Sequence, residues 1–208
     1  MAEKKIERTP LYTFARVVFA VLFHTICPVK YYNKQALQQA DAPYILISNH
    51  NSASDPILLA YPVKKYEIRF VGKRELTNNK FAEWIVNQLH MIPVSRHATD
   101  MTAMRTCMQT LKDGHVLGIF PEGTRHHAEL MENVESGAAM IALRANVPII
   151  PMYLSAPIRP FRRVRVRIGE PMQIDDIKEQ GLNSDTIKLL CDRIRETFYG
   201  LQAADNRK

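Results

Sequence analysis

An apolar run ends in a polar turn at Tyr44-Ile45-Leu46-Ile47-Ser48-Asn49-His50-Asn51-Ser52-Ala53-Ser54-Asp55. The run is short and bounded by polar residues, which indicates a buried strand, and groups that follow such a strand are well placed for chemistry in an α/β fold. A second strand-like run, Val116–Phe120, opens into Pro121-Glu122-Gly123-Thr124-Arg125. The first strand end offers a base, and the second offers a receptor for an anion.

His50 and Asp55 suit one chemical task if their side chains meet. A neutral imidazole accepts a hydroxyl proton near pH 7, and a carboxylate on its other nitrogen fixes the tautomer and stabilises the imidazolium. Five residues of regular helix would keep the two side chains apart, so we expect His50 in the turn and Asp55 at a helix start. Pro56 favours this break and predicts Asp55 as the N-cap. The alternative is that Asp55 only caps the helix and His50 is an ordinary turn residue.

The second block suits the binding of a phosphate. Gly123 lets the backbone approach a ligand closely, and Arg125 carries a planar, permanently charged guanidinium. A surface turn with a solvated arginine is the simpler alternative. The two blocks, N-H-x-x-x-x-D followed by F-P-E-G-T-R, together resemble the signatures of the glycerolipid acyltransferase family.

Two further blocks extend this resemblance. Val71–Leu76 with Met91–Arg96 is similar to the middle block of the family, and Val147–Met152 is similar to its last block, so that the likeness covers roughly residues 44–155. The chain departs from the family pattern at Glu83, His126 and Ser136, which the resemblance places mostly around the acceptor and away from the proposed base.

The resemblance implies transfer of a fatty acyl group from a thioester of coenzyme A or acyl carrier protein to a lipid hydroxyl. His50 would remove the hydroxyl proton, Asp55 would orient the imidazole, and the hydroxyl oxygen would attack the thioester directly. The chain has no G-x-S-x-G elbow for an acyl-enzyme route. We expect no cofactor besides the acyl thioester substrate and no metal.

For the acceptor phosphate, the resemblance implies Arg125 with Lys73, and the backbone around Gly123 and Thr124 as neutral donors. Glu122 would hold glycerol hydroxyls or fix Arg125, or would form a salt bridge without a catalytic role. The favoured reaction converts lysophosphatidic acid to phosphatidic acid. The alternatives are glycerol 3-phosphate, another lysophospholipid or an amino-lipid as acceptor, or a basic lipid-binding protein without turnover.

The length of 208 residues and a hydrophobic content of 46% suit one enzyme domain, which we place at residues 31–208 after an N-terminal segment at residues 1–30. Alternating strand and helix patterns predict an α/β fold with a mixed, largely parallel sheet covered by helices. The expected strands are near residues 44–48, 68–71, 116–120, 149–154 and 164–168, and the expected helices near 56–60, 81–89, 99–112, 137–145 and 187–198. Residues 203–208 are expected to fray.

Residues 11–27 are largely apolar but are interrupted by Arg16 and His24. They predict an amphipathic helix in the membrane interface rather than a spanning one; a signal peptide or an ordinary buried helix is the alternative. The net charge of +7 and a pI near 9.4 suit anionic lipid headgroups, acyl carrier protein or coenzyme A. No nucleic-acid motif is recognisable. We therefore expect a peripheral or monotopic protein at the cytoplasmic face of the cell membrane.

The remaining expectations concern one strand face, one helix face and the three cysteines. Arg163, Arg165 and Arg167 alternate along one strand face, which we expect to be solvated or, together with Arg159 and Arg162, turned toward the bilayer. Met101, Met104, Met108 and Leu111 share a helix face that is core or lines an acyl-chain groove. The three scattered cysteines indicate a reducing compartment without structural zinc.

Overall fold

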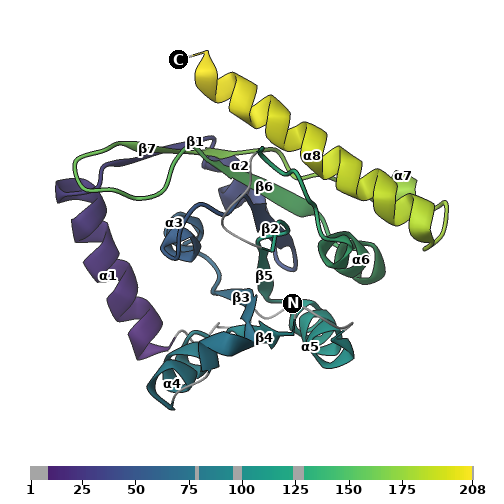
Figure 1. Ribbon diagram of the computed structural model, residues 1–208, viewed down its shortest axis with the longest axis horizontal. Helices are drawn as coiled ribbons and strands as arrows, with labels where there is room; N and C mark the ends of the chain where they lie inside the picture. The colour runs from purple at the N-terminus through teal and green to yellow at the C-terminus, as the bar shows by residue number, and fades with distance from the viewer. Residues whose placement is uncertain (1–8, 78–79, 96–99, 124–128, 208) are drawn as a thin grey trace.

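A central β-sheet organises the protein. The structure is a computed structural model that describes residues 9–77, 80–95, 100–123 and 129–207. In these ranges the sheet has seven strands in the order β1-β7-β6-β2-β5-β3-β4 (Figure 1). The strands are β1 (Val29–Tyr32), β2 (Ile45–Ser48), β3 (Ile68–Lys73), β4 (Ile92–Val94), β5 (Val116–Ile119), β6 (Ile149–Leu154) and β7 (Val164–Ile168).

The sheet is mixed but mostly parallel, as predicted. Only the β6–β7 pair is antiparallel among the described strand pairs, and β1 then pairs with β7 in parallel. The strands β2, β3, β5 and β6 therefore run in the same direction, and their carboxyl ends open at the same edge of the sheet. In open α/β sheets this edge is the usual place for a ligand.

Helices cover both faces of the sheet (Figure 1). They are α1 (Pro10–Thr25), α2 (Gln35–Gln39), α3 (Asp55–Ala60), η1 (Arg74–Thr77), α4 (Lys80–Gln88), α5 (Met101–Lys112), α6 (Ser136–Ala145), α7 (Asp175–Lys178) and α8 (Ser184–Asn206). The α/β architecture is thus confirmed.

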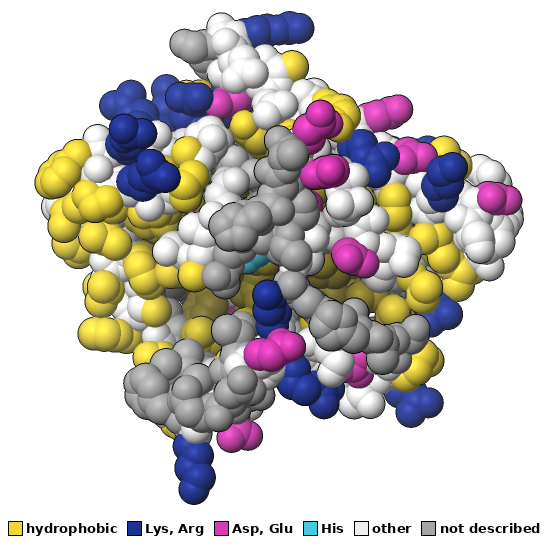
Figure 2. Space-filling view, in the orientation of Figure 1, with side chains coloured by type: hydrophobic (Ala, Val, Ile, Leu, Met, Phe, Trp, Pro, Cys, Tyr) yellow, Lys and Arg dark blue, Asp and Glu magenta, His cyan; other side chains and the backbone are white. Residues whose placement is uncertain are grey.

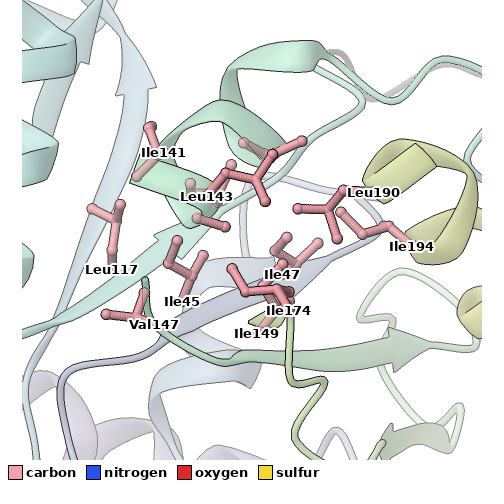
Figure 3. Packing of buried hydrophobic residues seen from close by; sticks show 14 of the residues in the cluster. Ile45, Ile47, Leu117, Ile141, Leu143, Val147, Ile149, Ile174, Leu190 and Ile194 are labelled. Atoms are coloured by element: carbon pink, nitrogen blue, oxygen red, sulfur yellow. The ribbon is translucent and has the colours of Figure 1, made fainter. Parts of the chain in front are cut away.

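Side chains of β2 alternate between two hydrophobic cores. Ile45 and Ile47 pack with α8 residues such as Leu190 and Ile194 (Figure 3), while Leu46 packs in the other core with α1, α2 and α3. Successive strand residues point to opposite faces, so a strand covered on both sides is apolar throughout. This explains why the apolar run before His50 shows no polar alternation.

Residues 203–206 continue the last helix, contrary to the expectation that residues 203–208 fray, and residue 208 lies outside the described residues. Helix α8 continues to Asn206, and the Asp205 side chain is buried with 2% exposure. Its carboxylate accepts hydrogen bonds from Arg165 Nε at 2.9 Å and from Arg167 Nε at 2.8 Å. The expectation of a solvated or bilayer-facing arginine is therefore wrong at Arg167, whose side chain is 11% exposed, whereas Arg165 binds Asp205 with its side chain still 39% exposed.

The methionine stripe of α5 is only partly core. The buried positions of α5 are Ala103, Cys107, Thr110 and Leu111, and Met101 is 50% exposed. Met104 and Met108 pack partly buried against the core, because the face that contacts the sheet is rotated toward the smaller residues.

Helix α1 lies along one side of the molecule (Figure 1). Its start is capped by Thr9, whose side chain accepts a hydrogen bond from the Tyr12 N–H. Tyr12 and Phe23 are buried, whereas several apolar residues on the opposite face are exposed. None of the helices among the described residues has the length and hydropathy needed to cross a bilayer.

Candidate active site

His50 and Asp55 meet at the carboxyl edge of the sheet. The Nδ1 atom of His50 lies 2.9 Å from the Asp55 Oδ2 atom, and the two side chains are 13% and 0% exposed. A buried carboxylate accepts, so Nδ1 carries the proton and Nε2 is the basic nitrogen of the neutral ring. The arrangement can take a proton and stabilise the resulting imidazolium.

Asp55 is the hub of the turn rather than the N-cap. The helix α3 begins at Asp55 with Ser54 as N-cap, which corrects the predicted cap position. The Asp55 carboxylate instead turns back, accepting from Asn51 N at 2.5 Å, Ser52 N at 2.7 Å and Ser52 Oγ at 2.7 Å. These donors compensate the burial of the charge and fix the oxygen that faces His50.

The residues beside His50 tie the turn to β6. Asn49 is 4% exposed, its Nδ2 donates to Leu154 O at 3.0 Å, and its Oδ1 accepts from Leu154 N at 2.8 Å. Asn51 Nδ2 donates to the same carbonyl at 3.1 Å. Two amide side chains thus hold the end of β2 to the end of β6. This role of Asn49 is not apparent from the sequence, because Leu154 lies 105 positions further along the chain.

Glu122 ties the same turn to β5. The register that pairs Ile47 with Ile119 brings His50 level with Glu122, and Glu122 Oε2 accepts from His50 N at 3.1 Å. Its Oε1 accepts from Met131 N at 2.8 Å, and the residue is 4% exposed. Both carboxylate oxygens are engaged with main-chain donors. A contact of Glu122 with glycerol hydroxyls or with Arg125 stays a prediction.

Two stacked phenylalanine rings, which we term the aromatic floor, lie against the imidazole of His50. The rings of His50 and Phe120 stack with centroids 4.1 Å apart, and Phe120 in turn stacks on Phe70 at 6.1 Å. Gly118 makes room for this stack, because a Cβ there would lie 2.4 Å from the Phe70 ring. The floor restricts the ring to one plane beside Asp55.

The predicted phosphate-binding residues are described in part. Lys73 is the last residue of β3 and is exposed, which puts it at the same sheet edge as His50. Gly123 has a φ of +66°, a conformation that favours glycine. Thr124 and Arg125 lie outside the described residues.

A polar cavity of about 210 Å³ opens beside His50. Besides His50, its lining includes Asn51, Glu122, Tyr153, Ser155 and Gln202. No three His, Cys, Asp or Glu side chains gather as a candidate metal site in the part of the chain that the structure describes.

Residues 28–155 match the Acyltransferase family, and the chain belongs to it. This confirms the resemblance predicted from the four sequence blocks. The chain is an acyltransferase of the group whose members include the lysophosphatidic acid acyltransferases.

Bacterial relatives match over most of their length. The chain is 29% identical over 197 residues to the 1-acyl-sn-glycerol-3-phosphate acyltransferase of Streptococcus pneumoniae, covering 91% of this chain and 72% of that protein. It is 29% identical over 171 residues to the protein of the same name from Bacillus subtilis, covering 80% and 84%.

A solved structure shares the fold. The crystal structure of the 1-acyl-sn-glycerophosphate (LPA) acyltransferase from Thermotoga maritima superposes with a TM-score of 0.66 at 22% identity, covering 93% of this chain and 77% of that one. At this identity the likeness supports the fold alone.

Proposed function

We propose that the protein transfers a fatty acyl group from acyl-CoA or acyl carrier protein to the hydroxyl of lysophosphatidic acid, giving phosphatidic acid. The observation that carries the proposal is the 2.9 Å contact between His50 Nδ1 and the buried Asp55 carboxylate. Family membership supports the transfer chemistry, and the names of the bacterial relatives support the acceptor.

In the proposed reaction His50 acts as general base. Its Nε2 takes the proton of the acceptor hydroxyl as the oxygen attacks the thioester carbonyl. Asp55 stabilises the imidazolium that forms. When the tetrahedral intermediate collapses, the C–S bond breaks and the imidazolium returns the proton to the leaving thiolate. No covalent acyl-enzyme is needed.

The acceptor phosphate is proposed to bind Arg125 and Lys73, with the backbone of Gly123 and Thr124 as neutral donors. Lys73 supports this assignment, because the parallel strands β2, β3 and β5 end at one edge. Glu122 is proposed to contact the glycerol hydroxyls through lone pairs that its two main-chain donors leave available.

The protein is proposed to act at the cytoplasmic face of the cell membrane, as a peripheral or monotopic protein. Residues 1–30 would be the interfacial segment and residues 31–208 the acyltransferase domain. The net charge of +7 and the exposed apolar residues of α1 support a contact with anionic lipid.

An acceptor panel tests the proposal. Purified protein is given acyl-CoA with lysophosphatidic acid, glycerol 3-phosphate or a zwitterionic lysolipid, and thiol release is followed. We expect lysophosphatidic acid to give the highest kcat/KM. A higher kcat/KM with another acceptor would show that lysophosphatidic acid is not the preferred acceptor. Release of the thiol without formation of an acylated lipid would contradict acyl transfer.

A pair of histidine variants tests the base. His50→Ala is expected to lower kcat by ~10²- to 10⁴-fold. His90→Ala is the matched control, because His90 Nδ1 also lies 2.9 Å from a carboxylate, that of Glu67, but at the amino-terminal edge of the sheet, where β3 begins. Equal losses in the two variants would show that His50 is merely structural.

A further inference from the structure

Among the large apolar residues of the described chain, Phe161 is the most exposed. Its side chain is 84% exposed, and it lies in the connection between β6 and β7. Arg162 N donates to Arg159 O at 3.2 Å and closes a four-residue turn, Arg159-Pro160-Phe161-Arg162, which we term the Phe161 turn. Phe161 stands at the third position, after the proline.

Neither packing nor backbone preference accounts for a phenylalanine there. Phe161 has a φ of +58°, and turns with proline second and a positive φ third favour glycine or asparagine in that place. An aromatic residue adds backbone strain at this φ and buries almost no surface within the protein. Strained positions of this kind point to function, since folding stability alone disfavours them.

The Phe161 turn lies at the same sheet edge as the candidate active site. Strand β6 runs parallel to β2, so the chain leaves β6 where it leaves β2, and Asn49 binds Leu154 at that point. Phe161 N donates to Ile26 O at 2.8 Å, which fixes the turn to the end of α1. The turn, the helix end and the catalytic edge are therefore held together.

The surface around the turn is apolar and basic. Helix α1 exposes Phe14, Val17, Val18 and Val21 at helical spacing. Lys30, which follows α1, and Arg159, Arg162 and Arg163, in or next to the Phe161 turn, are exposed as well. Residues 9–34 and 148–169 contain neither Asp nor Glu. In Figure 2 a cluster of lysine and arginine side chains borders a broad hydrophobic area on the side where α1 and the β6–β7 connection lie.

We propose that the Phe161 turn is a membrane anchor. Phe161 inserts among the acyl chains of an anionic bilayer, Arg159, Arg162 and Arg163 bind lipid phosphates, and the exposed face of α1 lies in the same interface. The proposal rests on the proposed function, since it turns the edge that carries His50 toward a lipid acceptor.

The charge pattern selects a bilayer over a second copy of the chain. A symmetric pairing of this surface would bring two sets of basic residues together without a described acidic partner among them. An anionic lipid surface supplies many phosphates to the same arginines, at about fivefold in affinity for each basic residue near the surface. In this arrangement Phe161 and the exposed apolar residues of α1 are buried among the acyl chains of the bilayer and not in an interface with another protein.

Substitution of Phe161 should change stability and membrane binding in opposite directions. Phe161→Gly is expected to raise the unfolding temperature, because it relieves the backbone strain, and to weaken binding to phosphatidylglycerol-containing vesicles roughly tenfold. Tyr199→Ala, which removes an exposed aromatic side chain from α8, is expected to bind as the wild type does. Unchanged vesicle binding by Phe161→Gly would overturn the proposal.

Charge reversal tests the arginines. Arg163→Glu is expected to weaken binding to anionic vesicles about five- to thirtyfold, whereas Lys188→Glu, an equal change on exposed α8 surface, is not. Equal binding of the wild type to neutral and anionic vesicles would contradict the arginine contacts. A concentration-dependent dimer that Phe161→Gly abolishes would show that the surface pairs with itself instead.

Activity separates this proposal from the proposed function. With an acceptor in vesicles, Phe161→Gly should lose activity in step with binding, and with a monomeric short-chain lysophosphatidic acid it should match the wild type. Equal losses on both acceptors would overturn the anchor. Vesicle binding that depends on Phe161 in a protein without transferase activity would leave the anchor in place and refute the proposed reaction.

Discussion

Replacing Asp55 by Asn removes one charge from the candidate active site with little change of shape. The carboxylate accepts from His50 Nδ1, Asn51 N, Ser52 N and Ser52 Oγ. An asparagine oxygen in the place of Oδ2 keeps the first three contacts, and its NH₂ group then faces Ser52 Oγ, which can rotate to accept. The turn and the tautomer of His50 are retained, but the negative charge is lost.

The size of the effect follows from the distance. With the nitrogen and oxygen 2.9 Å apart, the centres of charge of an imidazolium and a carboxylate lie about 4 Å apart. At an effective dielectric constant of about 20 their interaction is ~4 kcal/mol. Because about 1.4 kcal/mol corresponds to a tenfold change in rate, kcat should fall by ~10³-fold.

The assay is thiol release from acyl-CoA at saturating acceptor, with the unfolding temperature measured in parallel. Ser52→Ala is the matched control, because it removes one hydrogen bond to Asp55 and leaves the charge; we expect it to lose less than about tenfold in kcat. If folded Asp55→Asn retained kcat within about threefold of the wild type, stabilisation of the imidazolium by Asp55 would be wrong.

Three other outcomes follow from buried groups. Asp205→Asn should lower the free energy of unfolding by about 3 kcal/mol at pH 7, since its two arginine partners lose their counter-charge. Burial opposes ionisation of Asp205, but the arginine hydrogen bonds outweigh it and hold its pKa below the ordinary value. The stabilisation should therefore be complete above about pH 3.9 and decrease as the pH falls toward the lower folded-state pKa. If the difference in urea unfolding between the wild type and Asp205→Asn did not shrink as the pH is lowered below about 3.9, this reasoning would be wrong. Gly118→Ala should cost about 1–3 kcal/mol, because the added methyl group meets the Phe70 ring, and an unchanged denaturation midpoint would refute that packing. Burial raises the pKa of the Cys107 thiol to about 12 and also raises that of Cys191, so both should resist a thiol reagent at pH 8 until the protein unfolds.

The central strands were predictable because each is covered on both faces. A fully buried strand is a continuous apolar run, and β2, β5 and β6 have this pattern. The edge strands β1 and β4 were not predicted. β4 is three residues long and contains Pro93, and a proline weakens the strand pattern because it has no N–H to donate to a neighbouring strand. Both segments become strands through the neighbour that they pair with.

The candidate site was predictable where its contacts are local. The contact between His50 and Asp55 follows from spacing and a helix start, which the sequence displays. The contacts of Asn49 with Leu154 and of Glu122 with His50 join residues that only the folded sheet brings near. The role of Asp205 on α8 could not be predicted for the same reason, because its partners Arg165 and Arg167 lie on β7, 40 and 38 positions earlier in the chain.

The anchoring of the His50 turn also bears on how the protein folds. Asn49 contacts a residue 105 positions away, and His50 contacts one 72 positions away. Contacts between such distant parts of a chain close slowly, whereas helices form early. During refolding, the helical circular dichroism signal should therefore recover before the catalytic turn is assembled, and recovery of turnover would mark the last stage of the process.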